Sequence, residues 1–254
     1  MFAGSTYKLK VRAHNIHGWG EWSEVGRVLA TGVPDEPDPP ITVINNKFVR
    51  ITWTDPAANF EAIDSYRVLV VHSDGVTFTE ELTYCDASDP VTFERQYCEI
   101  PLALLESTDY SFQLSAGQLI KAKVAARNLN GWGEFSQESI IAANFETTPS
   151  KMAAPTRNAA TTTGKLVVDW VPLVSPDTGY SDITSYNLQW DKGTDGATWV
   201  NLIGFNTASL AETYTIAASL NEGDHYQLKV RANNFWGWGE FSDPLTIKTA
   251  TWPY

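Results

Sequence analysis

The sequence has little positive charge, little cysteine and no long apolar run. Its 254 residues include 18 Lys and Arg against 30 Asp and Glu, so the net charge is −12. A surface this acidic repels a phosphate backbone, and we expect no nucleic-acid partner. A membrane-spanning helix needs about 18 or more consecutive apolar residues, and no segment approaches that length. We therefore expect no membrane insertion by this segment.

The residue patterns that usually carry chemistry are also lacking. Four histidines are scattered along the chain, and His14 and His17 have no cysteine or carboxylate at ligand spacing beside them. The sequence contains no glycine-rich phosphate loop, nucleophile elbow or metalloprotease helix. These absences predict that the chain is not an enzyme and that it binds no cofactor and no metal.

Aromatic residues, in contrast, are abundant, and they recur in an internal repeat. The chain has 10 Trp, 10 Tyr and 11 Phe. Three segments align without gaps, each ending in Gly-Trp-Gly-Glu, an aromatic residue and Ser: 7–23, 120–136 and 226–242. Their first glycines are 113 residues (18 to 131) and 106 residues (131 to 237) apart. This spacing corresponds to one β-sandwich domain of about 100 residues per repeat.

The second and third repeats share further features upstream of these segments. Each has a short apolar run that ends in a tryptophan, at Trp53 and at Trp170. An alternating stretch that contains Ile-x-Ser-Tyr follows each run, with the tyrosines at Tyr66 and Tyr186. Short apolar or alternating runs bounded by Gly, Pro, Asn and Asp are typical of β-strands, so the pattern predicts an all-β sandwich for each repeat.

Because of these residues, each complete repeat resembles a fibronectin type III domain. Trp53 and Trp170 match the core tryptophan of that family's second strand, and the Tyr-x-Leu-x-Val-x-Ala-x-Asn pattern from Tyr226 matches its sixth strand. The resemblance implies a tyrosine corner at Tyr226, whose hydroxyl bonds to nearby backbone. The second repeat has Ile120 at this position, so its corner is expected to rely on packing alone.

The resemblance implies a chain of tandem seven-stranded fibronectin type III, immunoglobulin-like sandwiches arranged as a rod. Residues 38–149 are predicted to form one domain with an insertion, and residues 152–250 another. Residues 1–32 supply only the last two strands of a domain, with an apolar face of Tyr7, Leu9, Val11 and Ala13. Either the chain is a portion of a longer protein, which we favour, or a neighbouring copy supplies the missing strands. The proline-bearing linkers are expected to be extended and semi-rigid.

The only two cysteines, Cys85 and Cys98, fall in one inserted loop of the second repeat. A metal site would need more ligands, and a redox pair is usually Cys-x-x-Cys, so a structural disulfide is favoured over two reduced core cysteines. Such a bridge closes a loop of about 14 residues, worth roughly 3 kcal/mol, and implies an oxidising, extracellular compartment. The cysteine-bearing insertion and the glycine-tryptophan turns are similar to the tandem repeats of large surface proteins in ciliate-type protists.

The Gly-Trp-Gly-Glu-aromatic-Ser turn is the most distinctive motif. With three residues per turn of a polyproline-like segment, Trp19 and Trp22 project on one side, where they can stack over Lys10 and Arg12. The motif resembles the Trp-Ser-x-Trp-Ser box of cytokine-receptor domains. We interpret it as an external stabilising ladder rather than a ligand-binding surface. The ladder residues are predicted to be Trp19, Trp22 and Arg12 in the first repeat, Trp132, Phe135, Lys123 and Arg127 in the second, and Trp238, Phe241, Lys229 and Arg231 in the third.

The same turn carries a candidate modification. Trp19-Gly-Glu-Trp22 has the Trp-x-x-Trp spacing of the C-mannosylation signal of secreted proteins, and Trp132 and Trp238 carry a version with phenylalanine. No Asn-x-Ser/Thr sequon occurs, so a glycan on this segment is expected on tryptophan or on hydroxyl clusters.

These features predict a non-enzymatic structural or adhesive segment of a long extracellular or cell-surface protein, with filament formation as one form of that role. Its expected partners are other fibronectin type III domains of the same chain or of neighbouring copies, with glycans and surface proteins as further candidates. Two alternatives stay open: a ligand-binding receptor ectodomain of the cytokine-receptor type, and an accessory module of a secreted enzyme.

Overall fold

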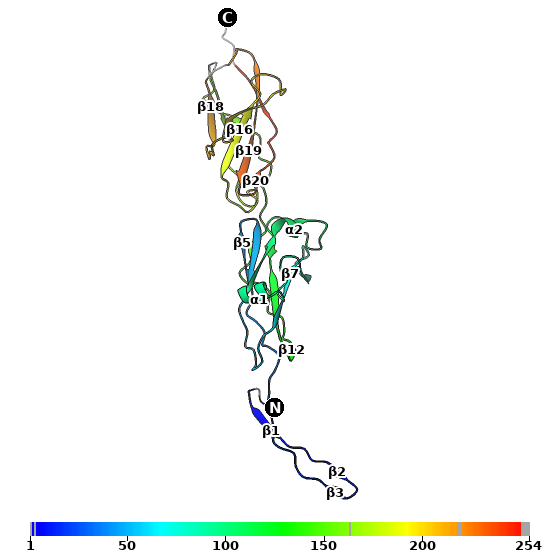
Figure 1. The fold of residues 1–254 in the computed structure, drawn as a ribbon. Helices are drawn as coiled ribbons and strands as arrows, with labels where there is room; N and C mark the ends of the chain where they lie inside the picture. The colour runs from blue at the N-terminus through cyan, green and yellow to red at the C-terminus, as the bar shows by residue number, and fades with distance from the viewer. Residues whose placement is uncertain (1, 3, 163, 218–219, 250–254) are drawn as a thin grey trace. The chain divides into compact units, whose positions relative to one another are not determined.

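The computed structural model describes the whole chain except residues 1, 3, 163, 218–219 and 250–254. The described part is mostly β, with two short helices. It divides into two compact units, residues 1–144 and 145–254, which can be followed in Figure 1 by the colour of the ribbon. The boundary lies ahead of residue 152, where the sequence places the start of the last domain. The division into three domains stays a prediction.

The first unit begins with a hairpin. Strand β1 (Thr6–Leu9) pairs with β4 (Gly26–Leu29), and β2 (His14–Asn15) pairs with β3 (Gly18–Trp19). The apolar face expected here is open to solvent, since Leu9 is 58% and Val11 72% exposed. The Tyr7 hydroxyl accepts a hydrogen bond of 2.8 Å from the backbone N–H of Phe2.

The rest of the first unit is built from two main sheets and one short pair of strands. One sheet has the order β5-β6-β9 (Ile41–Asn45, Phe48–Thr52, Tyr97–Pro101) and the other β12-β11-β7-β8 (Gly131–Trp132, Ala122–Asn128, Ser65–Val71, Phe78–Glu80). The short pair is β10 (Leu119–Ile120) with β13 (Ala143–Asn144). Alternate residues of β6 face the core, and Val49 and Ile51 are fully buried beside Trp53, which is 3% exposed.

The second unit repeats this plan. One sheet has the order β14-β15-β18 (Thr156–Arg157, Leu166–Asp169, Thr213–Ile216) and the other β17-β16-β19-β20 (Val200–Ile203, Ser185–Trp190, His225–Asn234, Gly237–Trp238), with β21 (Leu245–Lys248) also paired to β19. The burial of β19 alternates strictly, so one face packs on the core around Trp170. The Tyr226 hydroxyl accepts from the N–H of Asn221 at 2.8 Å, as the expected tyrosine corner requires. Ala250, the expected end of this domain, lies outside the described residues.

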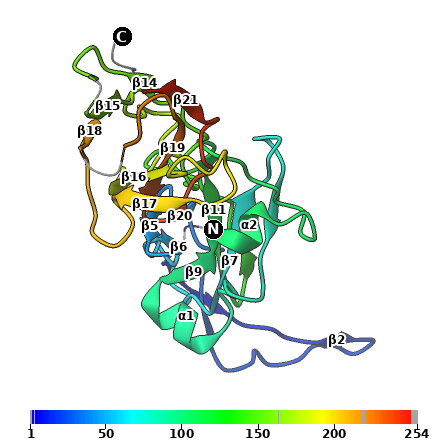
Figure 2. The same cartoon turned by 90° about the horizontal axis from the view of Figure 1, so that it is seen from above.

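The structure departs from the all-β expectation in the insertion of the first unit. Helix α1 (Pro90–Arg95) is capped at its N-terminus by Asp89, whose carboxylate accepts from the N–H groups of Val91 and Thr92. Helix α2 (Leu102–Glu106) directly follows β9 and buries its leucines. In Figure 2, α1 lies beside β9. Both helices are six residues or shorter, too short for a 3.6-residue period to be recognised in the sequence.

Candidate functional site

The three glycine-tryptophan turns share one hydrogen-bonded backbone. The Oδ1 atom of the preceding asparagine accepts from the N–H two residues on, at 2.9 Å for Asn15, 2.9 Å for Asn128 and 2.8 Å for Asn234. The first glycine then takes a φ of 122° to 128° in every copy, a conformation that an L side chain rarely adopts. Three identical turns therefore follow from the Asn-x-x-Gly pattern.

The serine that closes each motif joins the segment after the turn to the segment before it. The N–H groups of Ser23, Ser136 and Ser242 each donate at 2.8 Å to the carbonyl of a valine in the preceding segment. Their hydroxyl oxygens accept from the N–H of the same valine, at 3.1, 3.1 and 3.0 Å. The serine side chain thus replaces a backbone acceptor, and the segment stays bonded without forming a regular strand. Sequence reasoning did not assign this role, although the serine recurs in all three copies.

In the first repeat, one guanidinium lies between two tryptophans. Arg12 is 4.4 Å from the ring centroid of Trp19 and 4.6 Å from that of Trp22. The two rings are 60% and 53% exposed. His14 packs against Trp19 with a centroid distance of 4.7 Å. Lys10, predicted to stack here, has no cation–π contact among the described residues.

The third repeat has the longest ladder of alternating rings and cations. Lys229 lies 3.8 Å from the Trp199 ring and 4.5 Å from the Phe241 ring. Arg231 lies 4.2 Å from Phe241 and 4.7 Å from Trp238. Burial lowers the pKa of both cations, and the neighbouring charge of Arg231 adds to the effect on Lys229. The rings therefore exclude water from the two charges, which strengthens cation–π contacts. Sequence reasoning missed Trp199, which comes from the loop before β17.

The second repeat builds its ladder differently from the prediction. Arg127 is 5.4 Å from the Trp132 ring, but Lys123 lies over Phe78 at 4.5 Å instead of over the turn. Phe135 has no cation over its ring among the described residues. The reason is a substitution: Ala125 stands where the other repeats have Arg12 and Arg231.

Arg67 on the neighbouring strand provides the cation that the second repeat lacks at Ala125. It is the direct cross-strand partner of Ala125 in the β7–β11 register, and its guanidinium lies 4.7 Å from the Trp132 ring. The small alanine leaves room for this side chain on the same face of the sheet. The substitution at Ala125 was a signal in the sequence, but the compensating residue is set by strand register, which the sequence did not reveal.

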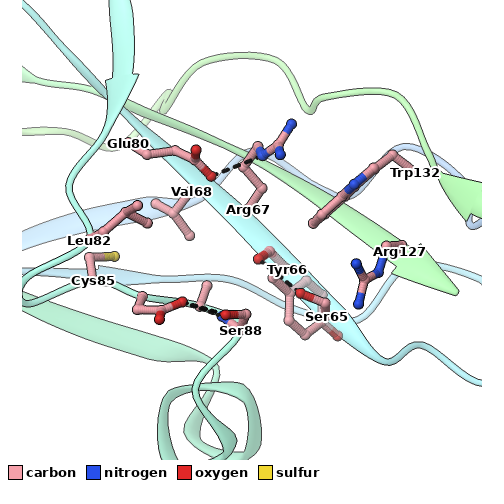
Figure 3. A pocket seen from close by; sticks show the side chains of 12 residues that line it. Ser65, Tyr66, Arg67, Val68, Glu80, Leu82, Cys85, Ser88, Arg127 and Trp132 are labelled. Atoms are coloured by element: carbon pink, nitrogen blue, oxygen red, sulfur yellow. Dashed lines mark hydrogen bonds and ion pairs between the residues drawn. The ribbon is translucent and has the colours of Figure 1, made fainter.

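A polar cleft of about 380 Å³ adjoins this ladder. Figure 3 shows Arg67, Arg127 and Trp132 along one side of it, with Cys85 and Ser88 of the insertion on the other. Both cations are already paired, Arg67 with Glu80 at 2.9 Å and Arg127 with Asp64 at 2.8 Å. The cleft therefore offers no free positive charge to an anionic ligand.

The expected disulfide between Cys85 and Cys98 is present, and both residues are buried. Its placement differs from the prediction, because only Cys85 lies in the insertion. Cys98 is in β9, opposite Ile51 of β6, and it faces the core on the same side of the strand as Ile100. The bridge thus ties the insertion to a core strand. Polar and apolar residues alternate from Tyr97 to Ile100, as in a strand with one buried face, and sequence reasoning overlooked this pattern.

Two further observations bear on function. The described residues contain no group of three or more His, Cys, Asp or Glu side chains placed to hold a metal ion. Within the same part of the chain, no helix has the length and apolar character needed to cross a membrane.

The ladder of the third repeat can be tested by a double-mutant cycle. Arg231→Ala and Phe241→Ala should be non-additive by about 0.5–2 kcal/mol in the free energy of unfolding, because each change removes the same contact. Urea unfolding of the two single variants and the double variant measures this. Arg157→Ala combined with Phe241→Ala is the control, since β14 belongs to the other sheet. Additivity in both cycles would show that the ladder contact contributes nothing.

A family comparison decides the identity of one region. The family model described as "Fibronectin type III domain" matches residues 150–248. Residues 150–248 form a fibronectin type III domain. The match covers most of the second unit, where the tyrosine corner and the core tryptophan of this domain have just been described. A fibronectin type III domain over residues 38–149 stays a prediction from the internal repeat.

Several curated relatives are named for the fibronectin type III domains that they contain. Fibronectin type-III domain-containing protein 3a of Gallus gallus is 26% identical over 262 residues, covering 100% of this chain and 19% of the relative. Ephrin type-B receptor 4b of Danio rerio is 27% identical over 236 residues, covering 89% of this chain and 22% of the relative. The chain thus spans about a fifth of the length of the curated relatives it matches.

A comparison of structures gives a weaker likeness. The crystal structure of chicken CNTN1 FN1-FN3 domains aligns over 97% of this chain and 76% of that chain, at 18% identity and a TM-score of 0.37. A TM-score of this size does not establish a shared arrangement.

Proposed function

We propose that this chain is a non-enzymatic structural or adhesive segment of a long extracellular or cell-surface protein, built from tandem fibronectin type III domains. The three predicted domains are residues 1–32 (partial), 38–149 and 152–250. The expected partners are further domains of the same kind, in the same long chain or in neighbouring copies, and glycans or surface proteins.

The observation that carries this proposal is the threefold recurrence of one closed turn and ladder. In the first and third repeats, two aromatic rings of the motif sandwich one cation from the segment before the turn, at Arg12 and Arg231. In the second repeat, Arg67 restores the arrangement after the loss of an arginine. Rings that are already stacked on internal cations stabilise the domain surface, which suits a module repeated for length rather than for one ligand.

The disulfide supports the extracellular part of the proposal. Disulfides persist in oxidising compartments and are rare in the cytosol. The bridge between Cys85 and Cys98 is buried in the core, where it serves structure rather than redox exchange.

Surface labelling of intact cells that produce the protein tests this function. A membrane-impermeant amine-reactive biotin should label the protein before permeabilisation, and electron microscopy of the purified native protein should show a linear array of domains. Labelling only after permeabilisation would contradict the location. A compact particle with no linear array would contradict the structural role.

A receptor ectodomain is the second candidate, because one relative is named Ephrin type-B receptor 4b. This function requires a soluble ligand that binds in a defined ratio at one domain. Saturable 1:1 binding of a secreted protein, lost on Trp22→Ala, would favour it over the structural role. Trp22 suits this test since its ring is 53% exposed.

A further inference from the structure

The last strand of the second repeat contains two residues that the other two repeats lack. In the first and third repeats, Tyr7 and Tyr226 each lie opposite a residue 21 positions later in the chain (7 to 28, 226 to 247). Ile120 occupies the same place in the second repeat, and it lies opposite Ala143, 23 positions later (120 to 143). The second repeat therefore has a two-residue insertion.

The insertion lies between Ser139 and Ala143. The N–H of Ser139 donates to the carbonyl of Ala122 at 3.1 Å. These two residues are 17 positions apart (122 to 139), as are the paired residues at the same place in the other repeats (9 to 26, 228 to 245). After Ser139 the chain bends at Ile140 and Ile141 before β13 begins. The two extra residues thus form a bulge.

The bulge places two large apolar side chains in solvent. Ile140 is 83% and Ile141 61% exposed. In the third repeat, which has no insertion, Ile247 of the last strand is 3% exposed. A bulge changes the direction in which the side chains of a strand point. The core of the domain therefore does not account for the apolar character of these two residues.

The exposed isoleucines continue an apolar surface on β5, the strand labelled in Figure 1. The N–H of Thr42 donates to the carbonyl of Ile141 at 3.1 Å, which brings the neighbours of Thr42 beside the bulge. These neighbours, Ile41 and Val43, are 43% and 44% exposed. We call Ile41, Val43, Ile140 and Ile141 the apolar patch. Exposed apolar side chains that are grouped in this way mark interaction sites, whereas scattered ones do not.

The surroundings of the apolar patch are electrically neutral. The two segments that form it contain no Asp, Glu, Lys or Arg: 39–46 and 139–145. Arg50, which lies opposite Val43 on β6, is paired with Glu99 at 2.8 Å. Lys121 is paired with Glu138 at 2.7 Å. A neutral, apolar surface does not attract a charged partner, so it selects a partner surface that is also neutral and apolar.

We propose that the apolar patch binds the same patch of a second copy of this chain, so that two copies associate side by side. This inference rests on the proposed function, in which neighbouring copies are partners. With a net charge of −12, two copies repel one another over most of their surface. At the apolar patch they can approach without bringing unpaired like charges together. A patch that meets itself is fully used in the pair, so the contact closes as a dimer.

The association is expected to be weak. A stable interface buries about 800 Å² on each partner, and four partly exposed side chains supply less than that. We therefore expect a dissociation constant of roughly 0.1–1 mM. Copies held on one cell surface can still pair, because their effective concentration there is high.

Sedimentation equilibrium of the full chain tests the proposal. The mean mass should rise from that of a monomer toward that of a dimer between about 10 μM and about 1 mM. The rise should be larger in about 0.5 M NaCl than in about 0.05 M, because salt screens the repulsion between the acidic copies and leaves the apolar contact intact.

A double variant with Ile140→Ser and Ile141→Ser should raise the dissociation constant by about tenfold or more, since most of the exposed apolar area is lost. Val171→Ser with Val174→Ser is the matched control. These valines are 73% and 71% exposed, but they lie in the second unit. The control should associate like the parent chain. Neither double variant should change the unfolding temperature, because all four side chains are exposed.

Methyl NMR of the isoleucine-labelled chain locates the contact. The signals of Ile41, Ile140 and Ile141 should shift with concentration. A parent chain that stays monomeric up to about 1 mM, a serine double variant that associates like the parent, or shifts confined to other isoleucines would each overturn the proposal. The serine double variant should still be labelled at the cell surface and should still form a linear array. Loss of the side-by-side contact is therefore distinguishable from failure of the proposed function.

Discussion

Replacing Trp170 by alanine is expected to cost about 3–5 kcal/mol in the free energy of unfolding of the fibronectin type III domain. Trp170 is 4% exposed and packs within the core formed by the two sheets of the second unit. Removing a ring of this size leaves a cavity that a close-packed interior cannot fill. Since small domains are stable by only about 5–15 kcal/mol, the variant will be partly unfolded near its physiological temperature.

Guanidinium unfolding followed by far-ultraviolet circular dichroism measures this loss. Val171→Ala is the control, because the adjacent side chain is 73% exposed and its removal should change stability by about 0.5 kcal/mol or less. Trp170→Phe should lie between the two, since the buried indole Nε1 has no hydrogen-bond partner among the described residues and only packing is lost. A Trp170→Ala domain as stable as the parent would contradict the assignment of this core.

Removal of the disulfide by Cys85→Ala and Cys98→Ala is expected to destabilise the first unit by about 3 kcal/mol. The bridge closes a loop across a sequence separation of 13, so its loss increases the freedom of the unfolded chain. It also frees the insertion from β9, the strand that contains Cys98.

The two units of one chain supply the control for this experiment. Neither cysteine lies in residues 145–254, so the urea transition of the second unit should stay where it is. Intact-mass measurement should first show the oxidised parent gaining about two hydrogens on reduction. Alkylation of both thiols without reductant, or an unchanged transition of the first unit, would contradict the structural role of the bridge.

The turns show how much of the site could be predicted from the sequence. The geometry of each turn depends on residues within a few positions of one another, such as Asn234 and Gly237. The repeated sequence is therefore enough to predict this geometry. The stacking of Arg12 between Trp19 and Trp22 also involves residues that are close together in the sequence. The alternation of strand residues and the buried positions of Trp53 and Trp170 could likewise be predicted.

The remaining features depend on contacts between distant segments. Arg67 reaches Trp132 because β7 and β11 pair in one register, and the pattern of either strand alone does not fix that register. A side chain at Gly133 or Gly239 would clash with the carbonyl group of a linker about 100 residues earlier in the chain, so both positions need glycine.

The repeat, the β-rich character and the chemistry of each turn can be derived from the amino-acid sequence, because they arise from local patterns of side chains. The packed fold is needed to show which cation covers Trp132, that Cys98 belongs to a core strand, and that the second glycine of the turn makes room for a linker. Each of these is a packing relation between segments far apart in the chain, and such relations exist only once the sheets have formed.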